Sequence, residues 1–423
     1  GCDDMLWRNI VLTLAAAAAC AAGISTASPA APPAESGYLD SVYDGSAFYL
    51  AGTGGRLDRV GSDGALESLS SGTQDDILCL AVNGSGILAG TGGGDILLSG
   101  HDGTQSVYSG KDAVCGLTRF QGAYYALTQK GSILRSSDGH SWSVSTQLKA
   151  SAPFLSLTAS NRTLSAITGE TDLFTSSNGS DWEEENFNDL YQDFYPAYRF
   201  TRSAGMGDTW FILGENAETG APLVMFTQAG EAWLQKDLQV INSQPAPTDP
   251  PIAVNDIAGN ADQLVVACDG GQVLTITNCS VCNQLQEFAP GTDLNTISVS
   301  ETSTLVAGEN FYFQLLSNTE VKQDQIQAEQ AQIDLANGAL LIDVREPSER
   351  AESGYIAGSL SVPLAQVAQE LPRIAPDRDQ ELIFYCASGS RSQTALETAQ
   401  ELGYTRVYNL GALSDWPYGI THD

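Results

Sequence analysis

The chain has 423 residues, of which 51 are acidic and 19 are basic, and its formal net charge is −32 at pH 7. A surface of this sign repels phosphate backbones, so the composition argues against nucleic-acid binding. The length is sufficient for two domains, and the hydrophobic fraction of 42% with 42 glycines is ordinary for a protein rich in β-strands.

The first segment has the pattern of an export signal. Met5 and Arg8 precede a short, alanine-rich apolar run, and small residues follow. We therefore expect residues 1–24 to be a signal peptide. Three alanines before Cys20 form a loose lipobox, which predicts a lipid on Cys20, whereas cleavage after Ala27 predicts free secretion. Both alternatives place the protein outside the cytoplasm, as a membrane-anchored lipoprotein or a secreted protein, and a transmembrane anchor is less favoured because the run is barely long enough.

A polar tether and a long repetitive region follow. Residues 25–37 are rich in serine, alanine and proline and are too polar to pack, so we expect a flexible connection. From residue 38 to residue 321 the chain repeats apolar strands followed by a polar hairpin, roughly every forty residues. The hairpins fall at residues 61–64, 100–103, 136–142, 176–182, 227–233, 276–282 and 316–319. Seven units at this spacing predict an all-β propeller of seven blades.

The fuller hairpins read Ser-x-Asp-Gly-x-x-Trp, as at residues 136–142. Asp accepts backbone N–H groups across such a turn, Gly takes the positive φ and Trp covers the hairpin with apolar surface. The pattern resembles the Asp-box repeat of sialidase-like (BNR) propellers, and the resemblance is to the turn rather than to an activity. Arginine is sparse in this region, which argues against a glycosidase.

The cysteines of the propeller region suggest structural roles. Cys279 and Cys282 stand where the sixth hairpin would have its glycine and tryptophan, and we predict a disulfide that replaces that contact. A redox pair or half of a metal site are the alternatives, but the first requires a strand-to-helix junction and the second requires further ligands, so no metal site is predicted. Cys79 and Cys115 can pair only if their strands are neighbours.

The C-terminal part contains the one stretch with a chemical signature. Residues 382–385 are apolar on both faces, as expected of a central parallel strand, and they end at Cys386. A glycine-bearing turn leads into a helix from Ser392, whose apolar residues recur at helical spacing. Backbone N–H groups and the helix dipole then surround the sulfur, so we expect Cys386 to favour the thiolate form.

The region around Cys386 resembles the rhodanese family. Leu-Ile-Asp-Val-Arg-Glu at residues 341–346, Gly-Tyr-Ile-Ala-Gly at residues 354–358 and a closing Gly…Trp element at residues 411–416 occur in the family's order. The resemblance implies that residues 322–423 form an α/β rhodanese domain with a central parallel sheet. Tyr355 departs from the pattern, because the family usually has His there. The six residues from Cys386 to Arg391 match the sulfurtransferase loop, which is one residue shorter than that of the related phosphatases and arsenate reductases.

The resemblance implies a rhodanese-type sulfurtransferase of the thiosulfate:cyanide class, without a cofactor, and the predicted export signal places it outside the cytoplasm. Cys386 would form a persulfide from thiosulfate or another sulfane-sulfur donor and pass the sulfur to a thiol or protein acceptor. Arg391 and the Ser388 hydroxyl would contact the oxyanion of the donor. The full set of predicted substrate-binding residues is Ala387, Ser388, Gly389, Ser390, Arg391 and Ser392. In the alternative function the propeller is a surface-anchored scaffold that binds a protein or glycan, and the rhodanese domain is an accessory docking or redox module.

Overall fold

The computed structural model describes residues 36–228, 233–235, 252–259, 263–277, 283–318 and 324–422. The predicted signal peptide, Cys20 and the Cys279–Cys282 pair lie outside these residues and stay predictions. Eight β-sheets are present in the described chain, seven in the propeller region and one in the C-terminal region. No helix among the described residues combines the length and the apolar character that crossing a membrane requires.

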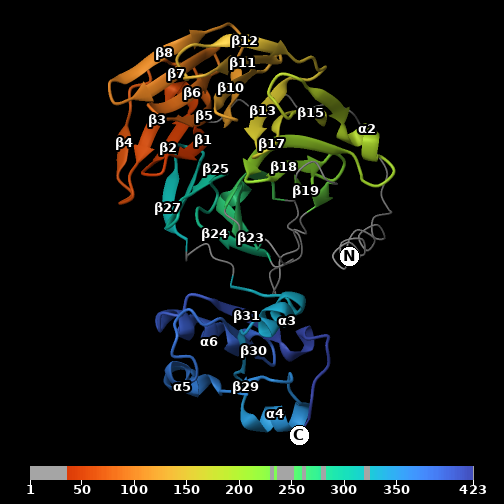
Figure 1. Cartoon of the computed structure of the whole chain (residues 1–423). Coiled ribbons are helices and arrows are strands. Elements are labelled where there is room, and N and C mark those ends of the chain that lie inside the picture. The colour runs from red at the N-terminus through yellow and green to blue at the C-terminus, as the bar shows by residue number, and fades with distance from the viewer. Residues whose placement is uncertain are drawn as a thin grey trace. The chain divides into compact units, whose positions relative to one another are not determined.

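Each of the first seven sheets is one antiparallel blade whose strands follow chain order (Figure 1), which confirms the predicted propeller. The strands, blade by blade, are β1 (Tyr38–Tyr43), β2 (Phe48–Gly52), β3 (Leu57–Val60) and β4 (Leu66–Ser68); β5 (Ile77–Asn83), β6 (Gly86–Thr91), β7 (Asp95–Gly100) and β8 (Gly103–Ser109); β9 (Val114–Phe120), β10 (Ala123–Thr128), β11 (Ser132–Ser136) and β12 (Ser143–Gln147); β13 (Phe154–Ala159), β14 (Leu164–Thr168), β15 (Asp172–Ser176) and β16 (Glu183–Asn186); β17 (Tyr198–Met206), β18 (Thr209–Asn216), β19 (Pro222–Gln228) and β20 (Leu234–Gln235); β21 (Val254–Gly259), β22 (Gln263–Cys268), β23 (Gln272–Thr277) and β24 (Asn283–Glu287); and β25 (Leu294–Val299), β26 (Ser303–Gly308) and β27 (Phe313–Ser317).

The hairpin at residues 136–142 shows how the sequence builds a blade edge. The Asp138 carboxylate accepts the backbone N–H groups of His140 and Ser141, at 2.8 and 3.0 Å. These bonds hold the pKa of Asp138 at about 2. Gly139 has φ +81°, which favours glycine, and the Trp142 indole donates to the Gly139 carbonyl at 2.9 Å. The predicted roles of Asp138 and Gly139 in this turn are confirmed, and the Trp142 ring packs against the hydrophobic cluster of blades 2 and 3.

The first strands of neighbouring blades pack against one another around the ring, and β25 closes it against β1. Near this closure the Ser41 hydroxyl lies 2.7 Å from the hydroxyls of both Thr296 and Ser298. The closure is therefore polar, because hydroxyl groups on buried strand faces satisfy one another here.

An ion cluster joins three of these first strands. The Arg202 guanidinium of β17 lies 2.5 Å from Asp40 of β1 and 2.8 Å from Asp256 of β21. Burial acts to lower the pKa of Arg202, but the two carboxylates outweigh it and the pKa is raised. Asp256 also accepts the backbone N–H of Ile297 at 2.9 Å. Removing the arginine would leave two carboxylates unpaired between strands that only the ring brings together.

The C-terminal domain is built on a parallel sheet of order β29-β28-β30-β31, as expected of an α/β fold. Its strands are β28 (Leu340–Asp343), β29 (Leu360–Ser361), β30 (Leu382–Cys386) and β31 (Val407–Ala412), and its helices are α3 (Ala328–Ala336), α4 (Pro347–Ser353), α5 (Val367–Ile374) and α6 (Ser390–Glu401). All five residues of β30 are buried, and the strand lies between β28 and β31, as its two apolar faces predict.

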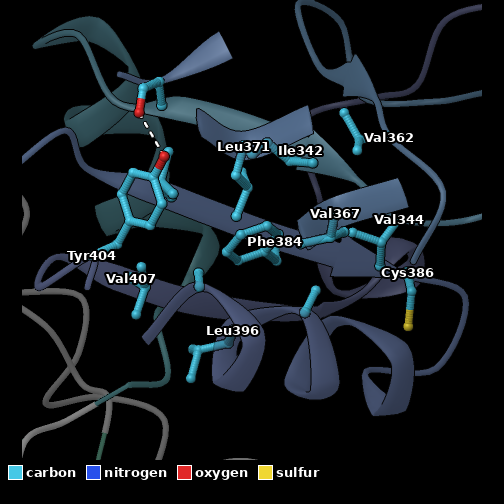
Figure 2. Close-up of a cluster of buried hydrophobic side chains, with 14 residues drawn as sticks. Ile342, Val344, Val362, Val367, Leu371, Phe384, Cys386, Leu396, Tyr404 and Val407 are labelled. Atoms are coloured by element: carbon cyan, nitrogen blue, oxygen red, sulfur yellow. Dashed lines mark hydrogen bonds between the residues drawn. The ribbon is translucent and has the colours of Figure 1, made fainter. Parts of the chain in front are cut away.

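Alternate residues of β30 supply two hydrophobic cores. Phe384 and Cys386 belong to the core that α5 and α6 cover, which Figure 2 shows, whereas Ile383 and Tyr385 belong to the core that contains residues of α3. The Tyr404 hydroxyl at the rim of the first core donates to the Ala375 carbonyl at 2.6 Å, the dashed line in Figure 2. Cys386 lies at the edge of this core, where the strand ends and the loop before α6 begins.

Candidate active site

Cys386 is the last residue of β30 and is buried. Its Sγ accepts the backbone N–H of Gly389 at 3.0 Å, and the Ser392 hydroxyl lies within 3.6 Å of the same sulfur. Gly389 has φ +90° and immediately precedes α6, so this position favours glycine. The loop can curl around the sulfur because the glycine permits this turn.

The surroundings of the Cys386 thiol favour its ionised form. Burial raises the pKa of Cys386, but the Ser392 hydroxyl and the N–H groups of Ser392, Ser388 and Gly389 outweigh it, and the pKa is lowered. Hydrogen bonds donated to a thiolate stabilise the charged form, which is the nucleophile. The expected preference for thiolate is therefore supported by named donors.

Two buried residues hold the loop in this shape. Ser392 is fully buried in the first turn of α6, and its hydroxyl also reaches the Gly389 carbonyl at 3.0 Å. The Asn409 side chain of β31 donates to the same carbonyl at 3.2 Å and accepts the Gly411 N–H at 2.9 Å. Sequence reasoning missed Asn409, because its role depends on β31 lying beside β30.

Arg391 is engaged by a residue from another helix. Its guanidinium forms a bidentate ion pair with the Glu349 carboxylate of α4, with N–O distances of 2.7 and 2.8 Å. The Arg391 bonds are the largest cause that lowers the pKa of Glu349 to about 2. Glu349 also accepts the Glu346 N–H at 3.0 Å, as the N3 residue of the capping box that begins α4 at its N-cap Glu346. The pair orients the only cation of the loop, and sequence reasoning missed it because 42 residues separate the partners.

The Asp-Val-Arg segment forms a buried support beneath the site. Arg345 is 2% exposed, and its guanidinium pairs with Asp343 at 2.6 and 2.9 Å. The same carboxylate accepts the Tyr385 hydroxyl at 2.8 Å. Arg350 stacks on the ring of Tyr355 at 3.6 Å from its centroid, at the position where the family pattern has His. These contacts tie β28, α4 and the segment after α4 together.

The six predicted substrate-binding residues differ in the groups that they direct toward the Cys386 sulfur. Ser388, Gly389 and Ser392 direct N–H or O–H groups toward the sulfur, and Arg391 carries the charge. Ala387 and Ser390 are exposed and face solvent beside it. A small anion would meet N–H groups and one oriented guanidinium here.

The propeller cysteines have the opposite environment. Cys79 on β5 and Cys115 on β9 occupy neighbouring strands, yet both thiols are free and donate to the carbonyls of Val114 and Leu127. Burial raises the pKa of Cys115 and of Cys268 to about 12 in each case. These thiols act as small apolar residues of the core.

A thiolate-stabilising loop at the carboxyl end of a parallel strand, joined in one chain to a propeller, defines a two-domain protein with a cysteine-based transfer site. Residues 322–417 match the family model described as Rhodanese-like domain. Thiosulfate sulfurtransferase PspE of Escherichia coli is 36% identical over 74 residues, which cover 18% of this chain and 70% of that protein. The chain belongs to the rhodanese family.

Other relatives agree over the same part of the chain. A sulfurtransferase of Allochromatium vinosum is 38% identical over 78 residues, covering 18% of this chain and 70% of its own length. The uncharacterized protein YqhL of Bacillus subtilis is 42% identical over 79 residues, covering 18% of this chain. The chain spans 60% of the length of YqhL, less than two thirds.

The propeller resembles solved structures in fold alone. The structure titled "YCF48 bound to D1 peptide" aligns with a TM-score of 0.52 and 14% identity, over 67% of this chain and 94% of that one. U3-55K aligns with a TM-score of 0.50 and 15% identity, over 66% of this chain and 90% of that one. At this identity the likeness confirms a propeller and carries no function.

Proposed function

We propose that the protein is an extracytoplasmic sulfurtransferase that carries sulfane sulfur on Cys386. The thiolate attacks the outer sulfur of thiosulfate, the S–S bond of thiosulfate breaks, and sulfite leaves with the electron pair of that bond. Cyanide or a thiolate then attacks the outer sulfur of the Cys386 persulfide, which gives thiocyanate or a new persulfide and restores the thiolate. No cofactor enters either step, and charge and sulfur balance in both.

The observation that carries this proposal is the hydrogen bonding of the Cys386 sulfur. The Gly389 N–H at 3.0 Å and the Ser392 hydroxyl at 3.6 Å favour negative charge on the thiolate, and the same groups would stabilise the persulfide anion. Arg391, held by Glu349, lies on the same loop and offers a guanidinium to the sulfonate oxygens of thiosulfate. The sulfurtransferase relatives in this region support the reaction class.

The test is a thiosulfate:cyanide assay on the purified chain, with mass spectrometry of the intact protein and of its proteolytic peptides. We expect turnover and, after thiosulfate alone, a mass increase of one sulfur atom on the peptide that contains Cys386. Cys386→Ser should abolish both signals, and Cys268→Ser serves as the matched control in the propeller. Absence of turnover with thiosulfate and with glutathione persulfide would contradict the proposal.

The location outside the cytoplasm rests on the apolar segment before residue 25 and on the tether after it. If Cys20 carries a lipid, the protein should sediment with membranes, and Cys20→Ala should move it to uncleaved precursor or to the medium. A mature N-terminus at Ser28 would indicate secretion without a lipid. Recovery of the full chain in the cytoplasm would contradict both forms.

The alternative function, a propeller scaffold with an accessory rhodanese module, is favoured by one structural observation. The propeller has a cavity of about 610 Å³ between its fourth and fifth blades. The two functions are compatible in one chain, so turnover at Cys386 supports sulfur transfer without excluding the scaffold, whereas no turnover with any sulfane donor favours the scaffold alone.

A further inference from the structure

Aromatic side chains line the cavity between blades 4 and 5. It is lined by Trp182 of the β15–β16 hairpin, Trp210 of β18 and Trp233 before β20, and by Tyr191 of α2 (Phe187–Tyr191). Trp210 and Trp233 are 5% and 8% exposed, and their rings meet edge to face with 4.9 Å between centroids. With about 610 Å³, the space accommodates a side chain together with part of its backbone.

Two hydrogen-bond donors in this lining have no acceptor. The indole N–H groups of Trp182 and Trp210 are buried, and no acceptor lies in reach among the residues that the structure describes. The equivalent Trp142 in blade 3 donates to the Gly139 carbonyl at 2.9 Å, so this hairpin type can satisfy its own indole. Buried donors are almost always paired, and the two exceptions in one cavity point to an acceptor that a ligand supplies.

The charged residues among the described lining of the cavity are all acidic. Its described residues include no lysine, arginine or histidine, and the acidic ones are Asp181, Glu183, Glu184, Glu185 and Asp208. Asp208 lies 3.8 Å from Arg162, whereas no ion pair engages the three consecutive glutamates within the described chain. Burial and the neighbouring Glu183 raise the pKa of Glu185. A bound cation would relieve this repulsion.

Exposed apolar side chains lie close in sequence to Tyr191, which lines the cavity. Helix α2 is the one α-helix in the described part of the propeller, and it lies at the outer edge of the propeller (Figure 1). Leu190 of this helix is 54% exposed, and Phe194, whose N–H bonds to the Tyr191 carbonyl, is 75% exposed. Charged edge strands also discourage pairing with other sheets, but that role explains neither the aromatic cavity nor the exposed Phe194.

We propose that this cavity is a binding site for a basic peptide segment of a partner protein, with a lysine or arginine side chain in the cavity and an apolar neighbour against Leu190 and Phe194. The aromatic rings and the glutamates attract the cation. Backbone carbonyls of the segment accept the two indole N–H groups, which a metal ion or a free polyamine cannot do. Sulfur transfer at Cys386 is independent of this site.

A neutral oligosaccharide is the competing ligand, since sugar rings stack on tryptophan and hydroxyl groups satisfy both donors and carboxylates. It would leave the charges of Glu183, Glu184 and Glu185 uncompensated, which favours the cation. Electrostatic binding also predicts strong weakening by salt, which sugar binding does not.

The test uses the full chain and the fluorescein-labelled peptide Gly-Phe-Lys-Ala-Arg-Phe-Gly, with the Lys→Gln, Arg→Gln peptide and maltohexaose as the other probes. The binding variant is the triple substitution Glu183→Gln, Glu184→Gln and Glu185→Gln. Its charge-matched control is Glu67→Gln, Asp102→Asn and Glu218→Gln, which changes exposed carboxylates elsewhere on the propeller. We expect the binding variant to weaken the basic peptide about tenfold or more and the control to change it less than about twofold.

A second pair of variants tests the indole donors. Trp182→Phe keeps an aromatic ring and removes the N–H, and we expect an affinity loss of about threefold to tenfold, whereas Trp142→Phe should leave affinity unchanged. Equal losses in the binding variant and its control would show nonspecific attraction to the acidic surface and overturn the site. Binding of maltohexaose with no binding of the basic peptide would overturn the ligand class. Failure of every probe to bind at low ionic strength would overturn the proposal.

Discussion

The four free cysteines of the described chain show two opposite uses of burial. In the propeller, Cys115 and Cys268 are surrounded by apolar strands, and burial raises the pKa of each to about 12. In the rhodanese domain Cys386 is also buried, yet its pKa is lowered because N–H and O–H groups point at the sulfur. Burial therefore does not decide reactivity, and the orientation of nearby dipoles does.

The largest expected effect is a difference in alkylation between these two environments. At pH 7 a thiol of pKa about 12 is ionised in roughly one molecule in a hundred thousand, so Cys115 and Cys268 should stay unmodified in the folded protein. Cys386 should react with iodoacetamide with a midpoint below the free-cysteine value of about 8.5, and its reaction should fade as the pH drops below that midpoint. Peptide mapping over a pH series measures this, and a midpoint at or above that of free cysteine would contradict the active-site assignment.

The next largest expected effect is a loss of propeller stability, which tests whether the stability of the propeller and the reactivity of Cys386 are independent. Arg202→Met leaves Asp40 and Asp256 unpaired in the ring, and we expect the free energy of unfolding of the propeller to fall by about 3–5 kcal/mol. Denaturant unfolding followed by tryptophan fluorescence measures the loss. The alkylation midpoint of Cys386 in the folded variant should not change, and a shift of that midpoint would show that the two regions are coupled.

Arg391→Ala should separate the contribution of the guanidinium charge to thiosulfate use from that of the backbone N–H groups of the loop. Loss of the guanidinium removes a charge-assisted contact, so we expect kcat/KM for anionic thiosulfate to fall about tenfold or more, with a smaller loss for a neutral persulfide donor. Glu349→Gln is the matched variant, because it keeps Arg391 and removes its partner, and it should change thiosulfate use by less than about threefold. Equal losses with both donors would show that Arg391 acts on loop structure instead.

Ser392→Ala should produce a smaller change in turnover than Arg391→Ala. The variant removes the hydroxyl beside the sulfur and keeps the N–H groups, so the alkylation midpoint should rise by about half a pH unit to one unit. Turnover should fall about threefold to tenfold below the midpoint and recover at higher pH, where the thiolate forms without help. Equal losses at every pH would indicate a loop that has changed shape.

Glu349 adds a prediction about acid stability. Its pKa is about 2 in the folded protein, below the ordinary value of 4.5. The Arg391–Glu349 pair therefore contributes stability that is fully present above about pH 4.5 and is lost as the pH falls toward 2. Both side chains are about one-third exposed, so we expect an effect of about 1 kcal/mol or less. Acid unfolding of Glu349→Gln should be less steep over this range, and an unchanged profile would contradict the contribution.

The sequence by itself determined the features that depend on neighbouring residues. The strand that ends at Cys386, the glycine at the turn and the helix after it are consecutive, and local periodicity is enough to predict them. The seven hairpins likewise predicted seven blades, because each is a local polar turn and the turns recur roughly every forty residues, although only those at residues 136–142 and 176–182 contain Asp or Asn, Gly and Trp together. The parallel sheet was predicted in another way, from the resemblance of the ordered motifs between residues 341 and 416 to the rhodanese family.

Only the tertiary structure decided which distant residues meet. Glu349 and Arg391 are on different helices, and Arg202 reaches carboxylates from the first and sixth blades, so no spacing along the chain predicts either contact. Trp142 and Trp182 occupy the same place in similar hairpins, yet the Trp142 indole N–H has an acceptor, whereas that of Trp182, a residue that lines the acidic cavity, has none among the described residues. The physical reason is that hydrogen bonds and ion pairs depend on distances of a few ångströms, and chain closure around the ring and across the sheet sets those distances.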